Sequence, residues 1–180
     1  LRSLYVAQPR APNHPAGYSL AQPTAECLEL RFPGEAAAQL LRGHVLHQLH
    51  RFSVAKEVAR ARVARRTLYL DYGLLDDALM EQGRLAEAGA AYQKMLDLKP
   101  FYQSYVRAAH MRWLKGDLDG AIEALRLAIG SASPRDRESS AWAWTRLAAY
   151  ELQAARFAQS LQAVDEALDR GFIDMLQQND

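Results

Sequence analysis

Equivalent residues recur along this chain at a nearly fixed distance. Phe52, Leu85 and Leu118 lie 33 residues apart, and Phe157 follows 39 residues later. A small residue stands three positions after each of them, namely Ala55, Ala88, Ala121 and Ser160. A period in the mid-thirties is typical of stacked helical hairpins, each of which buries its apolar face against its neighbours. The repeat therefore predicts an all-α fold before any single helix is considered.

The composition is consistent with such a fold. Hydrophobic residues make up 49% of the 180-residue chain, which is enough for a packed core in one domain. The formal net charge of +1 gives no general attraction to nucleic acid or to anionic membranes. The single cysteine, Cys27, excludes an internal disulfide and a cysteine-based zinc site. Because no apolar stretch reaches about 18 residues, we expect no membrane span. We expect a soluble protein, with the cytoplasm favoured and a periplasmic or secreted location left open.

Apolar residues recur at steps of three and four from residue 35 onward, the spacing of amphipathic helices. Gly83 and Gly116 are expected at turns within hairpins, and Asp136 or Ser133 is expected to cap the helix that follows. The last connection between hairpins carries six extra residues. The predicted helices span 36–49, 52–66, 69–82, 85–98, 102–115, 118–130, 138–154 and 157–170.

The two ends of the chain differ from the repeats. Residues 1–34 hold five of the seven prolines, so we expect an irregular segment with one short helix that begins at Pro23 and ends near Arg31. This segment either packs loosely on the outside or lies along the concave face of the stack. Residues 171–180 contain Phe172, Ile173, Met175 and Leu176, and they are a possible cap for the last helix.

Residues 69–100 resemble a tetratricopeptide repeat, whose pattern is W-x2-L-G-x2-Y, then A-x3-F, then P. The matching residues here are Tyr72, Leu75, Asp76, Leu79, Ala88, Tyr92 and Pro100. The next two copies keep Tyr105, Ala108, Ala121, Pro134, Trp144 and Leu147, and the copy at 36–66 is weaker. The resemblance implies a right-handed superhelical solenoid of about four antiparallel hairpins. They would occupy residues 35–67, 68–100, 101–134 and 138–171 of a repeat domain over 35–170.

In tetratricopeptide repeats the first helix of each hairpin lines the concave face. This resemblance implies a partner-binding groove lined by His44, His47, Leu74, Asp77, Met80, Arg107, His110, Trp113 and Arg146. Aromatic and arginine side chains dominate binding hot spots, and arginines can receive a carboxylate or phosphate. We therefore expect a scaffold that binds a protein or peptide, centred on Arg107, His110, Trp113 and Arg146. Alternatively, Trp113 and Met80 pack between hairpins and the arginines are solvated.

Other functions are less well supported by the residues. His44, Asp77 and His110 fall in one row, but first helices about 10 Å apart would keep both histidines from reaching one metal ion. The basic segment 60–66 is followed by an acidic unit, which interrupts the continuous track that nucleic acid needs. This segment is expected to be a solvated face or a contact for an acidic protein.

Catalytic motifs such as a Gly-rich phosphate loop or a nucleophile elbow are absent from the sequence. We therefore expect no enzyme activity, no cofactor and no nucleic-acid partner. The main alternative function is a structural section of a larger or self-associating assembly, which binds through the ends of the solenoid.

Overall fold

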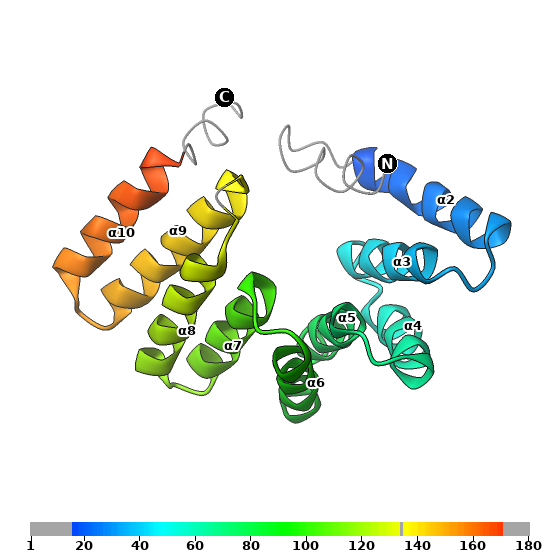
Figure 1. The fold of residues 1–180 in the computed structure, drawn as a ribbon, viewed down its shortest axis with the longest axis horizontal. Coiled ribbons are helices and arrows are strands. Elements are labelled where there is room, and N and C mark those ends of the chain that lie inside the picture. Colours follow the sequence, from blue (N-terminus) through cyan, green and yellow to red (C-terminus); the bar gives the residue numbers. More distant parts are fainter. Residues whose placement is uncertain (1–15, 134, 171–180) are drawn as a thin grey trace. The chain divides into compact units, whose positions relative to one another are not determined.

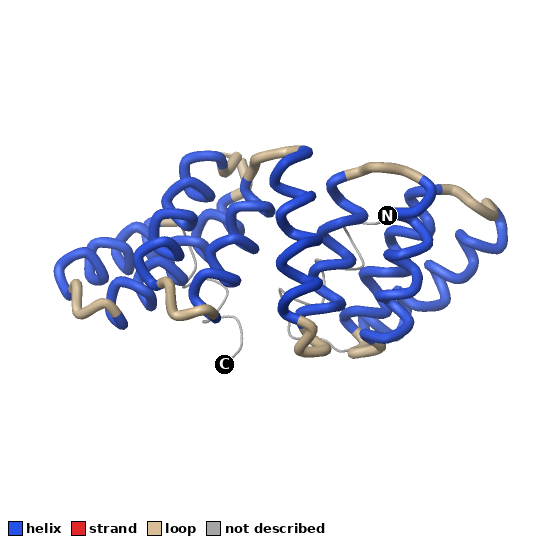
Figure 2. Tube along the Cα trace, turned by 90° about the horizontal axis from the view of Figure 1, so that it is seen from below, coloured by secondary structure: helices blue, strands red, loops and turns tan. Residues whose placement is uncertain are grey.

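The computed structural model describes residues 16–133 and 135–170, and its regular structure in these ranges is entirely helical (Figure 2). The chain divides into two compact units, Leu1–Leu98 (unit 1) and Lys99–Asp180 (unit 2). The described helices of unit 1 are α2 (Ala16–Arg31), α3 (Ala36–Gln48), α4 (Phe52–Arg65), α5 (Tyr69–Met80) and α6 (Leu85–Leu98). Those of unit 2 are α7 (Tyr102–Leu114), α8 (Leu118–Ser131), α9 (Arg137–Gln153) and α10 (Phe157–Asp169).

Successive helices pair as antiparallel hairpins, α3 with α4, α5 with α6, α7 with α8 and α9 with α10 (Figure 1). The small residue of each repeat lies in the hairpin interface, since Ala55, Ala88 and Ala121 are fully buried and Ser160 is 8% exposed. Small side chains let two helix axes approach to about 8–10 Å. Ser160 also donates its hydroxyl to the carbonyl of Ala148 at 2.9 Å. The predicted all-α fold of successive hairpins is confirmed.

The turn inside each hairpin contains one residue with a left-handed backbone. Gly83 and Gly116 have φ values of 69° and 79°, as the sequence predicts. The equivalent positions in the first and last hairpins hold His50 and Ala155, both with φ of 57°. Glycine adopts this conformation without steric cost, whereas other residues rarely do. Two of the four turns therefore carry local strain that the other two avoid.

The last hairpin accommodates the six extra residues in two places. Helix α9 has 17 residues where α7 has 13. The connection before α9 spans residues 132–136, compared with 99–101 before α7. Most of the insertion therefore extends α9 by about one turn, in agreement with the predicted helix over 138–154, and only the smaller part lengthens the connection that was predicted to carry all six residues. Asp136 caps the extended helix, because its Oδ1 accepts a hydrogen bond from the Ser139 backbone N–H at 3.0 Å.

Helix α2 corrects the prediction of an irregular N-terminal segment. It begins at Ala16, so Pro23 lies inside the helix and not in its first turn. Proline removes one backbone hydrogen bond from a helix interior. Packing of α2 on α3 offsets this cost, since Ala21 and Ala25 are buried against Leu41 and Val45. The remaining predictions for residues 1–15, for Pro134 and for the cap at 171–180 lie outside the described residues.

A buried ion pair joins three helices of unit 1. Arg62 of α4 is 2% exposed, and its Nε donates to Oδ1 of the fully buried Asp71 at 2.6 Å. Arg62 Nη1 also donates to the Ala36 carbonyl at 2.6 Å, and Arg66 Nε donates to Asp71 Oδ2 at 2.8 Å. Burial of two charges is tolerated here because each is paired and hydrogen-bonded. Arg62 thus connects the start of α3 to the first turn of α5.

Candidate functional site

An aromatic stack connects the first helices of the two hairpins in unit 2. Trp113 of α7 lies parallel to Tyr150 of α9, with ring centroids 5.8 Å apart and planes 9° apart. His110 stacks on Trp113 at 5.7 Å with an interplanar angle of 28°. The Trp113 Nε1–H donates to Oε1 of Gln153 at 2.8 Å, which fixes the indole orientation. We call His110, Trp113 and Tyr150 the aromatic stack.

Two arginines of the predicted groove, Arg107 and Arg146, lie on the same two helices as this stack. The Arg146 guanidinium lies over the Trp142 ring, 5.6 Å from its centroid, which is within the range of a cation–π contact. Burial raises the pKa of the Tyr150 phenol above its ordinary value, and the nearby Arg146 charge partly counteracts that rise. On α7, Arg107 Nη1 donates to the Gln103 carbonyl at 3.0 Å. We define the α7–α9 face as Arg107, His110, Trp113, Trp142, Arg146 and Gln153.

A second contact fixes the other ends of α7 and α9. The Tyr102 hydroxyl donates to the Ser139 carbonyl at 2.6 Å, in the extra turn of α9. Burial, followed by the negative charge of Asp136, raises the pKa of Tyr102 to about 12. Together with the Trp113–Gln153 bond, this contact holds α7 and α9 together near both ends. The α7–α9 face is therefore presented by a braced pair of helices.

The groove residues predicted in unit 1 differ in burial and in the side chains that they contact. His44, His47 and Asp77 are half-buried, and His47 meets the Phe52 ring edge-on at 5.3 Å between centroids. Met80 packs against the buried cluster of Leu79, Ala88 and Ala91, which lies inside its own α5–α6 hairpin.

Leu74 is fully buried, which corrects its assignment to a binding surface. It belongs to a core cluster with Leu40 and Ala59. Its burial depends on Gly43 of α3, since a Cβ at that position would lie 2.2 Å from Leu74 Cδ2. Because Gly43 has no side chain, Leu74 packs into the space next to α3 and cannot contact a partner at the surface.

Comparison with known proteins identifies the repeat in unit 2. Residues 102–133, the α7–α8 hairpin, match the family model of the tetratricopeptide repeat. The chain therefore contains a tetratricopeptide repeat in this hairpin. A search of curated proteins gives no match to the sequence.

Several solved structures share the tetratricopeptide-repeat fold across most of the chain. A thermophilic tetratricopeptide-repeat protein of Thermus thermophilus superposes with a TM-score of 0.79 at 18% identity, covering 91% of this chain and 89% of that one. A crystal structure of MamA gives a TM-score of 0.65 at 16% identity, with 86% and 89% covered. The structure of the APC/C hetero-tetramer Cut9–Hcn1 gives 0.71 at 13% identity, with 94% of this chain and 31% of that chain covered. Identities this low establish the fold alone.

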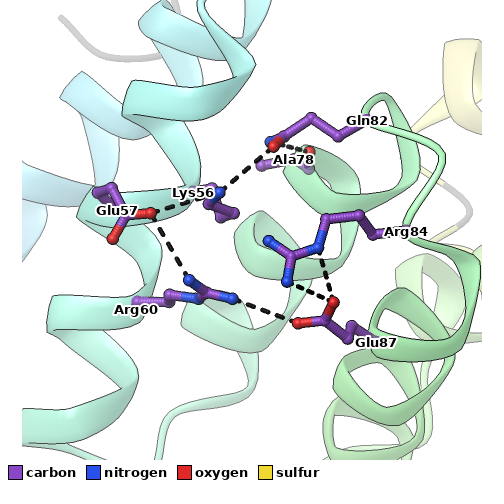
Figure 3. Close-up of polar contacts among 7 residues, drawn as sticks. All are labelled: Lys56, Glu57, Arg60, Ala78, Gln82, Arg84 and Glu87. Atoms are coloured by element: carbon purple, nitrogen blue, oxygen red, sulfur yellow. Dashed lines mark hydrogen bonds and ion pairs between the residues drawn. The ribbon is translucent and has the colours of Figure 1, made fainter.

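The basic segment 60–66 is largely paired within unit 1. Arg60 Nη2 lies 3.2 Å from Glu87 Oε2, and Arg84 Nε donates to the same carboxylate at 2.6 Å (Figure 3). Lys56 Nζ donates to Gln82 Oε1 at 3.3 Å. Arg62 is buried in its pair with Asp71, so the prediction of a solvated face is wrong for this residue, whereas Arg66 pairs with the same carboxylate and is 37% exposed. These side chains join repeats to one another and offer little free charge to a partner.

Neither a metal site nor a membrane span is found in residues 16–133 and 135–170. Within them, no group of three or more His, Cys, Asp or Glu side chains is arranged to hold a metal ion. No helix in the same ranges has the length and apolar character needed to cross a membrane.

Two contacts of the predicted groove residues involve side chains that the sequence analysis does not include. Trp142 lies under the Arg146 guanidinium, and Tyr150 stacks on Trp113. A spacing of four residues places Trp142, Arg146 and Tyr150 along one side of α9, and this signal could have found them. Which residue of α9 contacts Trp113 depends on how the two helices are rotated about their axes, and the spacing of residues in the sequence does not determine that rotation.

Proposed function

We propose that unit 2 binds a segment of a partner protein on the α7–α9 face. The observation that carries this proposal is the aromatic stack, which is held between two helices and accompanied by two arginines. Aromatic and arginine side chains supply much of the energy in protein interfaces. A surface that is already ordered loses less conformational entropy on binding. The hydrogen bonds of Trp113 and Tyr102 provide that order.

The chemistry of the face indicates the kind of segment it would accept. The exposed Trp142 side chain suits contact with apolar side chains, while Arg107 and Arg146 can donate to carboxylates. A short acidic segment with one or two apolar anchors would satisfy both features. Neutral or basic segments of the same length should bind more weakly because they bring no anion to the guanidinium groups.

The fold supports this role at a general level. Tetratricopeptide repeats generally act as scaffolds for protein–protein interaction and are typically non-catalytic. One structure with the same fold is of an assembly of two kinds of chain, Cut9 and Hcn1. We accordingly propose a scaffold role without catalytic activity or a cofactor.

The test is a selection of short random peptides on the immobilised protein, followed by affinity measurement by fluorescence anisotropy. Selected peptides should be rich in Asp or Glu next to apolar residues. Trp113→Ala and Arg146→Ala should each weaken binding by about tenfold, the loss expected for a hot-spot residue of more than 1 kcal/mol. Trp113→Phe keeps a stacking ring and loses the bond to Gln153, so it should have a smaller effect.

Two control variants match these changes. Leu127→Ala removes an exposed apolar side chain on α8, and Arg135→Ala removes an exposed arginine from the connection before α9. Both should leave affinity unchanged, and circular dichroism should show native helix content for every variant. If the controls weaken binding as much as Trp113→Ala and Arg146→Ala, or if no acidic peptide is selected, the proposal is wrong.

A further inference from the structure

Helix α10 exposes a continuous apolar stripe. Phe157 is 63% exposed, Leu161 67%, Val164 40% and Leu168 40%. Steps of four, three and four residues place these side chains along one side of the helix. The residues that pack α10 against α9 lie on a neighbouring side, where Ser160, Ala163 and Ala167 are buried. We call the four exposed residues the α10 stripe.

The preceding hairpin shows which neighbour covers the equivalent positions. At the equivalent positions α8 carries Leu118, Ile122, Leu125 and Ile129. Ile122 is 2% exposed and Leu125 is 1% exposed, and α8 packs against α9 as well as against α7. Helix α10 packs along α9, and no helix follows it within the described residues. The α10 stripe therefore corresponds to a surface that the next helix covers in the preceding hairpin.

We propose that residues 171–180 of the same chain cover the α10 stripe. This segment follows α10 directly and carries four apolar residues among its first six, Phe172, Ile173, Met175 and Leu176. Helices α5 and α7 each begin 17 residues after the start of the preceding helix. The same spacing counted from Phe157 gives residue 174. In the sequence, the apolar residues of the segment therefore fall at the position where the next helix of the repeat would begin.

The segment is long enough to reach the whole stripe. From Asp169 back to Phe157 the helix rises about 18 Å, at 1.5 Å per residue. Ten residues extend to about 33 Å, so even a partly folded segment spans this distance. Tethering so close to the stripe gives an effective concentration in the millimolar range. A second copy of the chain has no such advantage, and four partly exposed side chains offer far less than the ~800 Å² per partner of a stable interface.

Disulfide trapping in the full chain tests this contact. In a Cys27→Ser background, Leu161→Cys is combined with Met175→Cys, and the protein is oxidised at low concentration. A disulfide needs Cα atoms within about 7 Å, so it forms fastest at positions where the segment lies on the stripe. The control pair is Gln162→Cys with Met175→Cys, because Gln162 is exposed on another side of α10. The Leu161 pair should form an intramolecular disulfide about tenfold faster than the control pair.

The other outcomes overturn the proposal. Intermolecular disulfides in a dimer would show that a second copy covers the stripe. Equal rates for the two pairs would show that the segment does not seat there. A readout without cysteines is the binding of anilinonaphthalene sulfonate, which should rise several-fold in Phe172→Ser and return toward the wild-type level when Leu161→Ser is added. Unchanged dye binding in Phe172→Ser would equally refute the contact.

Discussion

The buried Arg62–Asp71 pair should determine much of the stability of unit 1. Asp71 is fully buried and accepts hydrogen bonds from Arg62 and Arg66, while Arg62 also holds the Ala36 carbonyl. The informative change is Asp71→Asn, which keeps the side-chain shape and removes its charge. Arg62 then remains buried without a counter-charge.

Removing one partner of a buried ion pair costs about 3–5 kcal/mol, because the remaining charge is left uncompensated. The contact with Arg66, which is 37% exposed, adds no more than about 1 kcal/mol. We therefore expect Asp71→Asn to lower the free energy of unfolding by about 3–5 kcal/mol. Arg62→Met combined with Asp71→Leu removes both charges, and this double variant should recover most of the loss.

Urea denaturation followed by two probes measures the effect. The three tryptophans, Trp113, Trp142 and Trp144, all belong to unit 2, so their fluorescence monitors that unit while circular dichroism monitors all helices. The loss in Asp71→Asn should appear in the circular dichroism transition. A loss below about 1 kcal/mol, the range of ordinary surface substitutions, would refute the reasoning. So would a double variant that is no more stable than Asp71→Asn.

Two further changes test local features of the hairpins. Ala155→Gly should raise the free energy of unfolding by about 0.5–1 kcal/mol. Ala155 has a φ of 57°, and two equivalent turns use glycine for this conformation. A loss of thermal stability in Ala155→Gly would contradict this reason. The pKa of Tyr102 rises from 10.0 in the unfolded chain to about 12 in the folded state. The unfolded chain therefore releases this proton at lower pH than the folded protein does. As a result, the free energy of unfolding falls as pH rises from about 10 to about 12. Tyr102→Phe should remove that part of the pH dependence in denaturation curves, and an unchanged slope would argue against the assignment.

The repeat was predictable because it depends on local pattern. Ala88 and Ala121 recur at a fixed spacing, and both are fully buried where the hairpin requires a small side chain. Pro23 misled the prediction because proline preferences describe an isolated helix, and the contacts of α2 with α3 outweigh them. The basic run 60–66 predicts a solvated Arg62, although the spacing of Arg62 from Ala55 and Ala59 places it on the buried side of α4.

The candidate site was only partly predictable. The resemblance to known repeats placed Arg107, His110, Trp113 and Arg146 on first helices, and the structure brings His110 and Trp113 into one stack. The sequence could not show that Tyr150 completes this stack, because that contact depends on the rotation of one helix against another. Binding by these residues remains a proposal that the peptide selection addresses.

The extra turn of α9 shows where this architecture can change its length. The added residues extend the helix at its start, and the positions after them keep their burial, since Ala143 and Leu147 are buried like Ser104 and Ala108. Residues added at this connection should therefore disturb the packed positions of α9 least. The same point is suitable for inserting an epitope or a reporter domain into the chain, provided that the Tyr102–Ser139 contact is left intact.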